Sequence, residues 1–163
     1  MGHAYETLVA WRKADDLAVE VYRMTARFPK SEMYGLTSQM RRAAVSVAAN
    51  IAEGAARQYM KEYQQFLYVA KASLAELSYH IHLAFRLELL DEADHNRLDT
   101  LRSEAGKPLQ GLIEWVERKI TEGVSLNKKV PDSTEPHTAS REPPTDNRKL
   151  PTEVFYATSN RSC

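Results

Sequence analysis

The sequence predicts an all-α protein, an antiparallel up-down-up-down four-helix bundle followed by a disordered C-terminal tail. Apolar residues recur at spacings of three and four in four segments before Gly123, which is typical of helices with one buried face. Short connections join these long segments, and short connections between amphipathic helices favour antiparallel neighbours. No stretch shows the strict alternation that is typical of a strand.

The first two expected helices carry clear end signals. The first should cover residues 7–27 and end before Pro29, because proline disfavours the helical conformation in the residue that precedes it. The second lies within the small, alanine-rich run from Tyr34 to Gly54. Thr37 or Ser38 is expected to cap its start, and Gly54 suits the left-handed residue that closes a helix.

The last two expected helices are longer. The third should cover residues 59–89, where apolar positions step alternately by four and three, close to the seam of a coiled coil. The fourth should cover residues 93–122, although Gly106 and Pro108 interrupt its pattern. Because an internal proline removes a hydrogen bond and crowds the preceding turn, we expect a kink near residues 104–108.

The chain changes character near Gly123. Most of its prolines follow this residue, among Ser, Thr, Asn and mixed charges, and large apolar residues become few and lose their period. Such a segment cannot bury enough apolar surface to offset the entropy of ordering it. We therefore expect a four-helix bundle over residues 1–122 and a disordered Pro/Ser/Thr-rich tail over residues 123–163.

Composition limits the function classes. The 163 residues hold 22 Lys and Arg against 22 Asp and Glu, so the net charge is zero, unlike that of a protein that coats nucleic acid. A nucleic-acid surface would need an asymmetric arrangement of these charges. Cys163 is the only cysteine, so no intrachain disulfide can form. No signal peptide and no run of about 20 apolar residues is evident, so we expect a cytoplasmic protein without a membrane segment.

The sequence offers no catalytic or metal-binding constellation. Glu92 and His95 have the spacing used in di-iron bundles, but no second copy occurs. His80 and His82 would diverge by about 200° on a helix and cannot share a metal. No glycine-rich phosphate loop is present, and Cys163 has no fixed base beside it. We expect no enzyme, no metal and no cofactor.

Several runs resemble one family. They are YGLTSQMRRAAVSVAANIAEG at residues 34–54, FLYVAKASLAEL at residues 66–77, and a tryptophan near the start, Trp11. Over about residues 8–120 the chain resembles the four-helix-bundle proteins encoded by intervening sequences in bacterial 23S ribosomal RNA genes. Similar proteins include the accessory variability factor of diversity-generating retroelements, which accompanies a reverse transcriptase. The resemblance implies a cytosolic homopentameric ring, nucleic acid as a partner, and no catalysis; the number five comes from the resemblance alone.

Basic residues on the second and third helices are the candidates for nucleic-acid binding. They are Arg41, Arg42, Arg57, Lys61 and Lys71. Such residues could contact phosphates, and repetition around a ring would multiply a weak site through avidity. A structural role is the alternative for the two adjacent arginines, in which either would pair with Glu53, Glu62 or Glu76 and hold helices or subunits in register.

Other residues are candidates for structural or interface roles. Asn50 could hydrogen-bond across helices and fix their register. Glu53 lies near a helix end where the helix dipole disfavours it, so we expect a specific partner. Glu76 is a possible ion-pair partner, and Trp11 belongs to the family resemblance. One set of aromatic residues could stack on bases but is more typical of a core or subunit interface: Tyr59, Tyr63, Phe66, Tyr68 and Tyr79.

Two functional hypotheses follow. The first is a non-catalytic ring that binds structured RNA or RNA–DNA, with RNA favoured over DNA, through contacts to the backbone. The second is an assembly scaffold that binds a protein partner such as a reverse transcriptase and contacts nucleic acid little. A protein whose only activity is self-assembly is a third reading of the same sequence.

Overall fold

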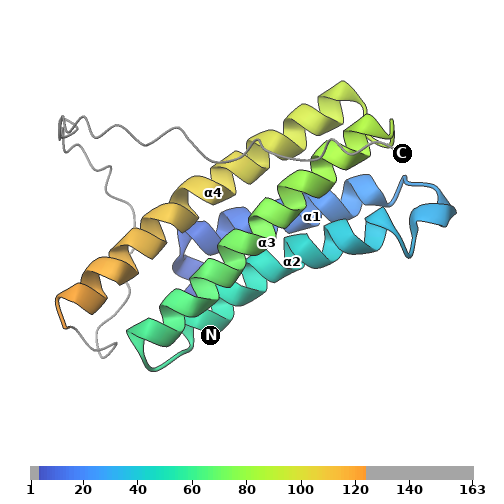
Figure 1. Ribbon diagram of the computed structural model, residues 1–163. Helices are drawn as coiled ribbons and strands as arrows, with labels where there is room; N and C mark the ends of the chain where they lie inside the picture. Colours follow the sequence, from blue (N-terminus) through green and yellow to red (C-terminus); the bar gives the residue numbers. More distant parts are fainter. Residues whose placement is uncertain (1–3, 124–163) are drawn as a thin grey trace, which may run out of the picture. The chain divides into compact units, whose positions relative to one another are not determined.

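The computed structural model describes residues 4–123 of the chain (Figure 1). These residues form four α-helices and two short 3-10 helices, and no strand. The α-helices are α1 (Val9–Thr25), α2 (Leu36–Ala55), α3 (Met60–Arg86) and α4 (Glu92–Thr121), and the 3-10 helices are η1 (Ala4–Thr7) and η2 (Lys30–Glu32). The predicted all-α fold is confirmed. The tail after Gly123, with Cys163, lies outside the described residues, so its predicted disorder and the domain boundary stay predictions.

The helices pack in the order in which they follow along the chain. Helix α2 packs against α1 and α3, and α4 packs against α1 and α3 (Figure 1). Within residues 4–123, the backbones of α2 and α4 do not approach each other closely, so these helices lie diagonally across the bundle. The connections between consecutive helices are short, as the sequence predicts for antiparallel neighbours. The outer face of α2 is therefore remote from α4.

The core consists of large aliphatic side chains between alanines. Leu17, Met40, Leu67 and Leu77 are fully buried, and they come from three different helices. Alanines at buried positions of every helix leave room for these side chains and allow the helix axes to approach closely: Ala14, Ala44, Ala70, Ala84 and Ala105. Burial of apolar area at about 25 cal/mol per Å² is the main source of stability for such a bundle.

The predicted cap of α2 is wrong. Gly35 occupies the N-cap position and makes no side-chain bond, and Thr37 and Ser38 lie inside the helix. The carboxylate of Glu32, in η2, takes the capping role, because its Oε2 atom accepts a hydrogen bond of 3.1 Å from the amide of Leu36. A carboxylate at this position also complements the positive end of the helix dipole. The 3-10 turn before α2 thus supplies the cap that the sequence pattern assigned to a hydroxyl.

The predicted role of Gly54 is also wrong. Gly54 lies inside α2 and is buried, and among residues 4–123 the left-handed glycine is Gly123, with φ of 69°. A Cβ atom added at Gly54 would lie 2.7 Å from Cδ2 of Tyr63 and 2.9 Å from Cβ of Phe66. Gly54 is therefore needed for the close approach of α3 to the end of α2. It does not close the helix.

Helix α4 continues through its proline. The helix runs from Glu92 to Thr121 with Pro108 inside it, so Gly106 and Pro108 do not divide it. The side chain of Asp91 caps its start by accepting a 2.7 Å bond from the amide of Asp94. The expected kink near residues 104–108 stays a prediction.

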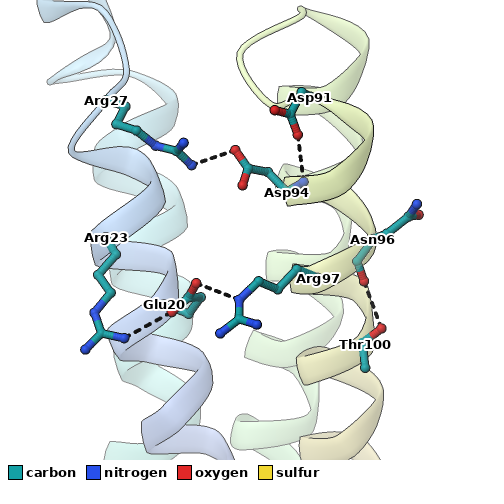
Figure 2. A network of polar contacts seen from close by, with 8 residues as sticks. All are labelled: Glu20, Arg23, Arg27, Asp91, Asp94, Asn96, Arg97 and Thr100. Carbon is teal, nitrogen blue, oxygen red and sulfur yellow. Dashed lines mark hydrogen bonds and ion pairs between the residues drawn. The ribbon is translucent and has the colours of Figure 1, made fainter.

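Ion pairs join α1 to α4 along one side of the bundle (Figure 2). The carboxylate of Glu20 accepts hydrogen bonds from Arg97 at 2.8 Å and from Arg23 at 3.3 Å, and Arg27 bonds Asp94 at 2.6 Å. The bond from Arg97 is the main cause that lowers the pKa of Glu20 below its ordinary value. Each exposed pair contributes little to stability, under about 1 kcal/mol. Together these pairs neutralise the charges that they join between α1 and α4.

One buried hydroxyl gives a stability prediction. Tyr63 is fully buried, its hydroxyl has no hydrogen-bond partner within residues 4–123, and burial raises its pKa. An unpartnered buried hydroxyl costs about 1–3 kcal/mol, so Tyr63→Phe is expected to raise the free energy of unfolding by about 1 kcal/mol in urea denaturation. The matched control is Tyr68→Phe, which removes a hydroxyl that donates to Glu117 at the surface and should lower stability by a few tenths. A loss of stability in Tyr63→Phe would contradict the interpretation that the buried Tyr63 hydroxyl has no hydrogen-bond partner.

Candidate nucleic-acid interface

The structure does not bring the five predicted basic residues into one patch. Arg41 and Arg42 lie in the first half of α2, Arg57 follows its last turn, and Lys61 lies in the first turn of α3. Because a helix rises about 1.5 Å per residue, the arginine pair and Arg57 are separated by roughly 20 Å along α2. Lys71, in the middle of α3, lies on a different side, as described below.

Arg41 is held in place by α1. Its Nε atom donates a 2.8 Å hydrogen bond to Oγ1 of Thr25, and its guanidinium lies 4.7 Å from the centre of the Tyr22 aromatic ring. Thr25 in turn donates to the carbonyl of Val21 at 2.7 Å. Within residues 4–123, no carboxylate forms an ion pair with Arg41. Its position is therefore fixed while its charge is not neutralised.

Arg42 and Lys61 are exposed cations without partners. Neither forms a hydrogen bond or an ion pair with another side chain in the described part of the chain. The proposed pairing of Arg41 or Arg42 with Glu53, Glu62 or Glu76 is accordingly not found there. A cation that nothing in its own chain neutralises is free to contact an external anion.

Arg57 has two partners of its own. It forms an ion pair with Glu53, four residues earlier, and its guanidinium lies 4.4 Å from the centre of the Phe66 aromatic ring. Glu53 was expected to have a specific partner, and the side chain that pairs with it here is Arg57. Glu76 does not pair with an arginine but lies 3.5 Å from Nε2 of His80. Arg57 is a weaker phosphate candidate than Lys61, because its charge is already compensated.

Lys71 lies on the side of α3 that packs against α4. Its Nζ atom donates a 3.0 Å bond to Oε1 of Gln110 on α4. The neighbouring α3 residue Tyr68 also faces α4, where it donates to Glu117. Lys71 therefore does not share a surface with Arg42.

Asn50 does not bond across helices. Its Nδ2 atom donates to the carbonyl of Ser46 at 2.7 Å and to the hydroxyl of Ser46 at 3.0 Å, within α2. The hydroxyl of Ser46 meets that of Ser73 on α3 at 2.8 Å. The hydrogen bond between helices that was expected of Asn50 is thus made by Ser46 and Ser73. Asn50 donates to Ser46 from within α2. Trp11 is half-buried against the core, and its ring centre lies 5.1 Å from that of Tyr5.

The aromatic residues considered for base stacking divide into two groups. Tyr63 belongs to the core, and Phe66 and Tyr68 are engaged with Arg57 and Glu117, so these three do not form a stacking platform. Tyr59 and Tyr79 are exposed. The interpretation as core is confirmed for Tyr63.

The structure adds a groove that sequence reasoning missed. It has a volume of about 580 Å³ and lies on the outer face of α2, between η2 and α1. Arg41 and Arg42 line it, and no carboxylate does. Its other walls are large side chains and hydroxyls: Tyr22, Met33, Tyr34, Val45, Thr37, Ser38 and Ser46. We call it the α2 groove.

Tyr34 is the most exposed large side chain of the α2 groove. It is 94% exposed, and Met33 beside it is 50% exposed. Both belong to the connection between η2 and α2, which has no helical period to mark them. In the sequence, only the Tyr34-Gly35 pair directly before the helix marks this connection. The α2 groove thus combines uncompensated cations with aromatic surface.

Within residues 4–123, no three His, Cys, Asp or Glu side chains are grouped closely enough to hold a metal ion. His95, half of the Glu92/His95 spacing, stacks on Phe85 with ring centres 4.5 Å apart. None of the described helices is both long and apolar enough to cross a membrane.

Residues 6–111 match the family described as the 23S rRNA-intervening sequence protein. The chain belongs to this family. The matched range contains all of α1, α2 and α3, and hence every residue of the α2 groove. The family resemblance stated from the sequence is confirmed.

A solved structure of the same kind of bundle is similar to the chain. It is the crystal structure of a protein of unknown function from the S23 ribosomal protein family of Bacteroides thetaiotaomicron VPI-5482, with 22% identity and a TM-score of 0.58. The match covers 64% of this chain and 98% of that chain. At this identity the likeness shows the fold alone. No curated protein matches the chain.

Proposed function

We propose that the protein is a non-catalytic RNA-binding bundle that contacts the phosphates of structured RNA or an RNA–DNA hybrid with the outer face of α2. The supporting observation is that Arg41 and Arg42 line a groove without a single carboxylate and are neutralised by nothing in residues 4–123. A guanidinium is a pure donor and a phosphate is a pure acceptor, so the two are complementary. The family description, which refers to 23S rRNA, points in the same direction.

The distribution of charge supports this surface despite the zero net charge. On the α1–α4 side, Lys13, Arg27 and Arg97 each pair with a carboxylate of the facing helix. Arg42 and Lys61, toward opposite ends of the α2–α3 pair, are free of such partners. Phosphate binding releases counterions from the nucleic acid, and this release needs cations that are not already paired. The α2 groove, whose lining has two arginines and no carboxylate, is therefore the surface that favours a polyanion.

Assembly into a homo-oligomeric ring forms part of the proposal. Val69 and Tyr79 on α3 are large apolar residues that remain exposed in the isolated bundle and do not line the α2 groove. Exposed apolar side chains favour association with another subunit. A ring would repeat each weak phosphate site and raise the overall affinity through avidity. The homopentameric state is proposed on the family resemblance.

The second candidate is an assembly scaffold for a protein partner such as a reverse transcriptase. The α2 groove supports it, because Tyr, Met and Arg are enriched at protein interfaces and five such residues line the groove: Tyr22, Tyr34, Met33, Arg41 and Arg42. A reverse-transcriptase gene beside this one would support the scaffold. If this protein binds the reverse transcriptase but binds no RNA, the result would decide for the scaffold.

Fluorescence anisotropy of a labelled RNA hairpin tests the proposal. We expect micromolar or tighter binding whose logarithm falls linearly with the logarithm of salt concentration between about 50 and 200 mM, with a slope of about −0.9 for each phosphate contacted in a duplex. Absence of binding at the lowest salt would refute RNA binding and favour the protein scaffold.

A further inference from the structure

We propose that the α2 groove binds an unpaired nucleotide, with the base against Tyr34 and the flanking phosphates against Arg41 and Arg42. This inference rests on the proposed RNA binding and narrows it. The preferred ligand becomes a single-stranded segment, such as the loop or end of a structured RNA, instead of the regular backbone of a duplex.

The shape of the surface is the first argument. The phosphates of a duplex form convex rows, and a flat or gently curved basic surface suffices to meet them. The α2 groove is an open depression with a volume of about 580 Å³, and aromatic and apolar side chains line it beside the two arginines. A base that is held in a duplex cannot lie against these side chains, whereas an unstacked base can be splayed out to do so.

The exposure of Tyr34 is the second argument. Tyr34 is 94% exposed, and within residues 4–123 it makes no hydrogen bond and no contact with another aromatic ring. Tyr22 and Met33, on the groove walls, are about half exposed, at 46% and 50%. Recognition of single-stranded RNA commonly uses unpaired bases stacked on aromatic side chains. An open phenol ring beside two cations provides both elements of such a site.

The geometry of Arg41 is the third argument. Its Nε atom is occupied by Thr25 and one of its faces by Tyr22, while its two terminal nitrogens have no partner within residues 4–123. The side chain is half-buried, so little conformational freedom remains to be lost when an anion binds. Arg42 follows it directly and is exposed. Together they offer one preformed and one exposed donor to the phosphates on either side of a base.

Aromatic and arginine side chains are also common at protein interfaces, so a second copy of the chain is the competing occupant. The groove lining favours the nucleotide, because it contains two adjacent guanidiniums, five side-chain hydroxyls and no carboxylate. A ligand rich in acceptors fits this lining better than a surface of mixed charge.

The test compares single-stranded with fully paired RNA of one sequence, about 12 nucleotides long, by anisotropy at one salt concentration. The proteins are the full chain, Tyr34→Ala, Arg42→Gln, and Tyr59→Ala as the control, because Tyr59 is also exposed but lies at the other end of α2. We expect single strands to bind about tenfold more tightly than duplex, and Tyr34→Ala to lose about tenfold on single strands only. Arg42→Gln should weaken binding of both RNAs, and Tyr59→Ala neither.

Three outcomes would overturn the inference. If both RNAs bind equally and Tyr34→Ala has no effect while Arg42→Gln still weakens binding, the base site is absent but the proposed RNA binding stands. If neither RNA binds, both proposals fail. If light scattering shows that Tyr34→Ala dissociates the oligomer, the α2 groove is a subunit interface. Since Tyr34 is almost fully exposed, the variant should fold, and its thermal unfolding provides the check.

Discussion

Replacement of Arg42 and Lys61 by glutamate in one protein is expected to weaken the binding of an RNA hairpin about a hundredfold at physiological salt. Both side chains are exposed and have no partner in residues 4–123. Each reversal removes one phosphate contact and its counterion release, and it adds repulsion between the new carboxylate and the RNA. Anisotropy titrations of the double variant and the unmodified chain measure the effect, and the salt slope should become shallower by about two contacts.

The matched control reverses Arg12 and Arg118, which are likewise exposed and form no ion pair within the described residues. They lie on α1 and α4, so the net charge changes equally while the α2 groove is untouched. The control should retain most of the affinity. An equal loss in both double variants would show that binding depends on net charge alone and would remove the assignment to α2.

Gly54→Ala is expected to lower the free energy of unfolding by about 1–2 kcal/mol. Alanine normally stabilises a helix relative to glycine by about 1 kcal/mol, but here its Cβ would lie 2.7 Å from the ring of the fully buried Tyr63. The ring cannot move away without disturbing the core, so α2 and α3 must separate slightly. Urea denaturation measures the difference.

Gly111→Ala is the control with the opposite sign. Gly111 lies inside α4, and a Cβ atom added there would meet no atom within 4 Å. The substitution should therefore raise the free energy of unfolding by about 0.5–1 kcal/mol. Equal stabilisation by both alanines would mean that Gly54 is not a close-contact position and that the helix pair is looser than described.

The bundle could be predicted because its evidence is local. Each helix carries its own apolar period, and burial of that face is the dominant favourable term in folding. Gly54 shows the limit of this reasoning, because a glycine near a helix end fits both a left-handed cap and a close contact, and only the position of Tyr63 on α3 decides between them. The prediction of the α2 cap was wrong for a similar reason, because the capping residue Glu32 lies in the neighbouring 3-10 turn.

The charged residues of the candidate site could be predicted from the sequence, but the side chains that contact them could not. Arg41 and Arg42 stand out in the sequence as adjacent cations in an apolar run. That Thr25 and Tyr22 fix Arg41 depends on the register between α1 and α2, which no local pattern specifies. Tyr34 and Met33 were missed because a connection has no period, so exposure there becomes visible only when the fold is known.

The most direct test of RNA binding by α2 is ultraviolet cross-linking of a bound RNA hairpin to the full chain, with the attached residues located by mass spectrometry. RNA binding by the α2 groove predicts cross-links in the segment from Met33 to Arg42 and at Tyr22, and their loss in the Arg42→Glu, Lys61→Glu variant. Cross-links confined to α4, or a pattern unchanged in that variant, would contradict it.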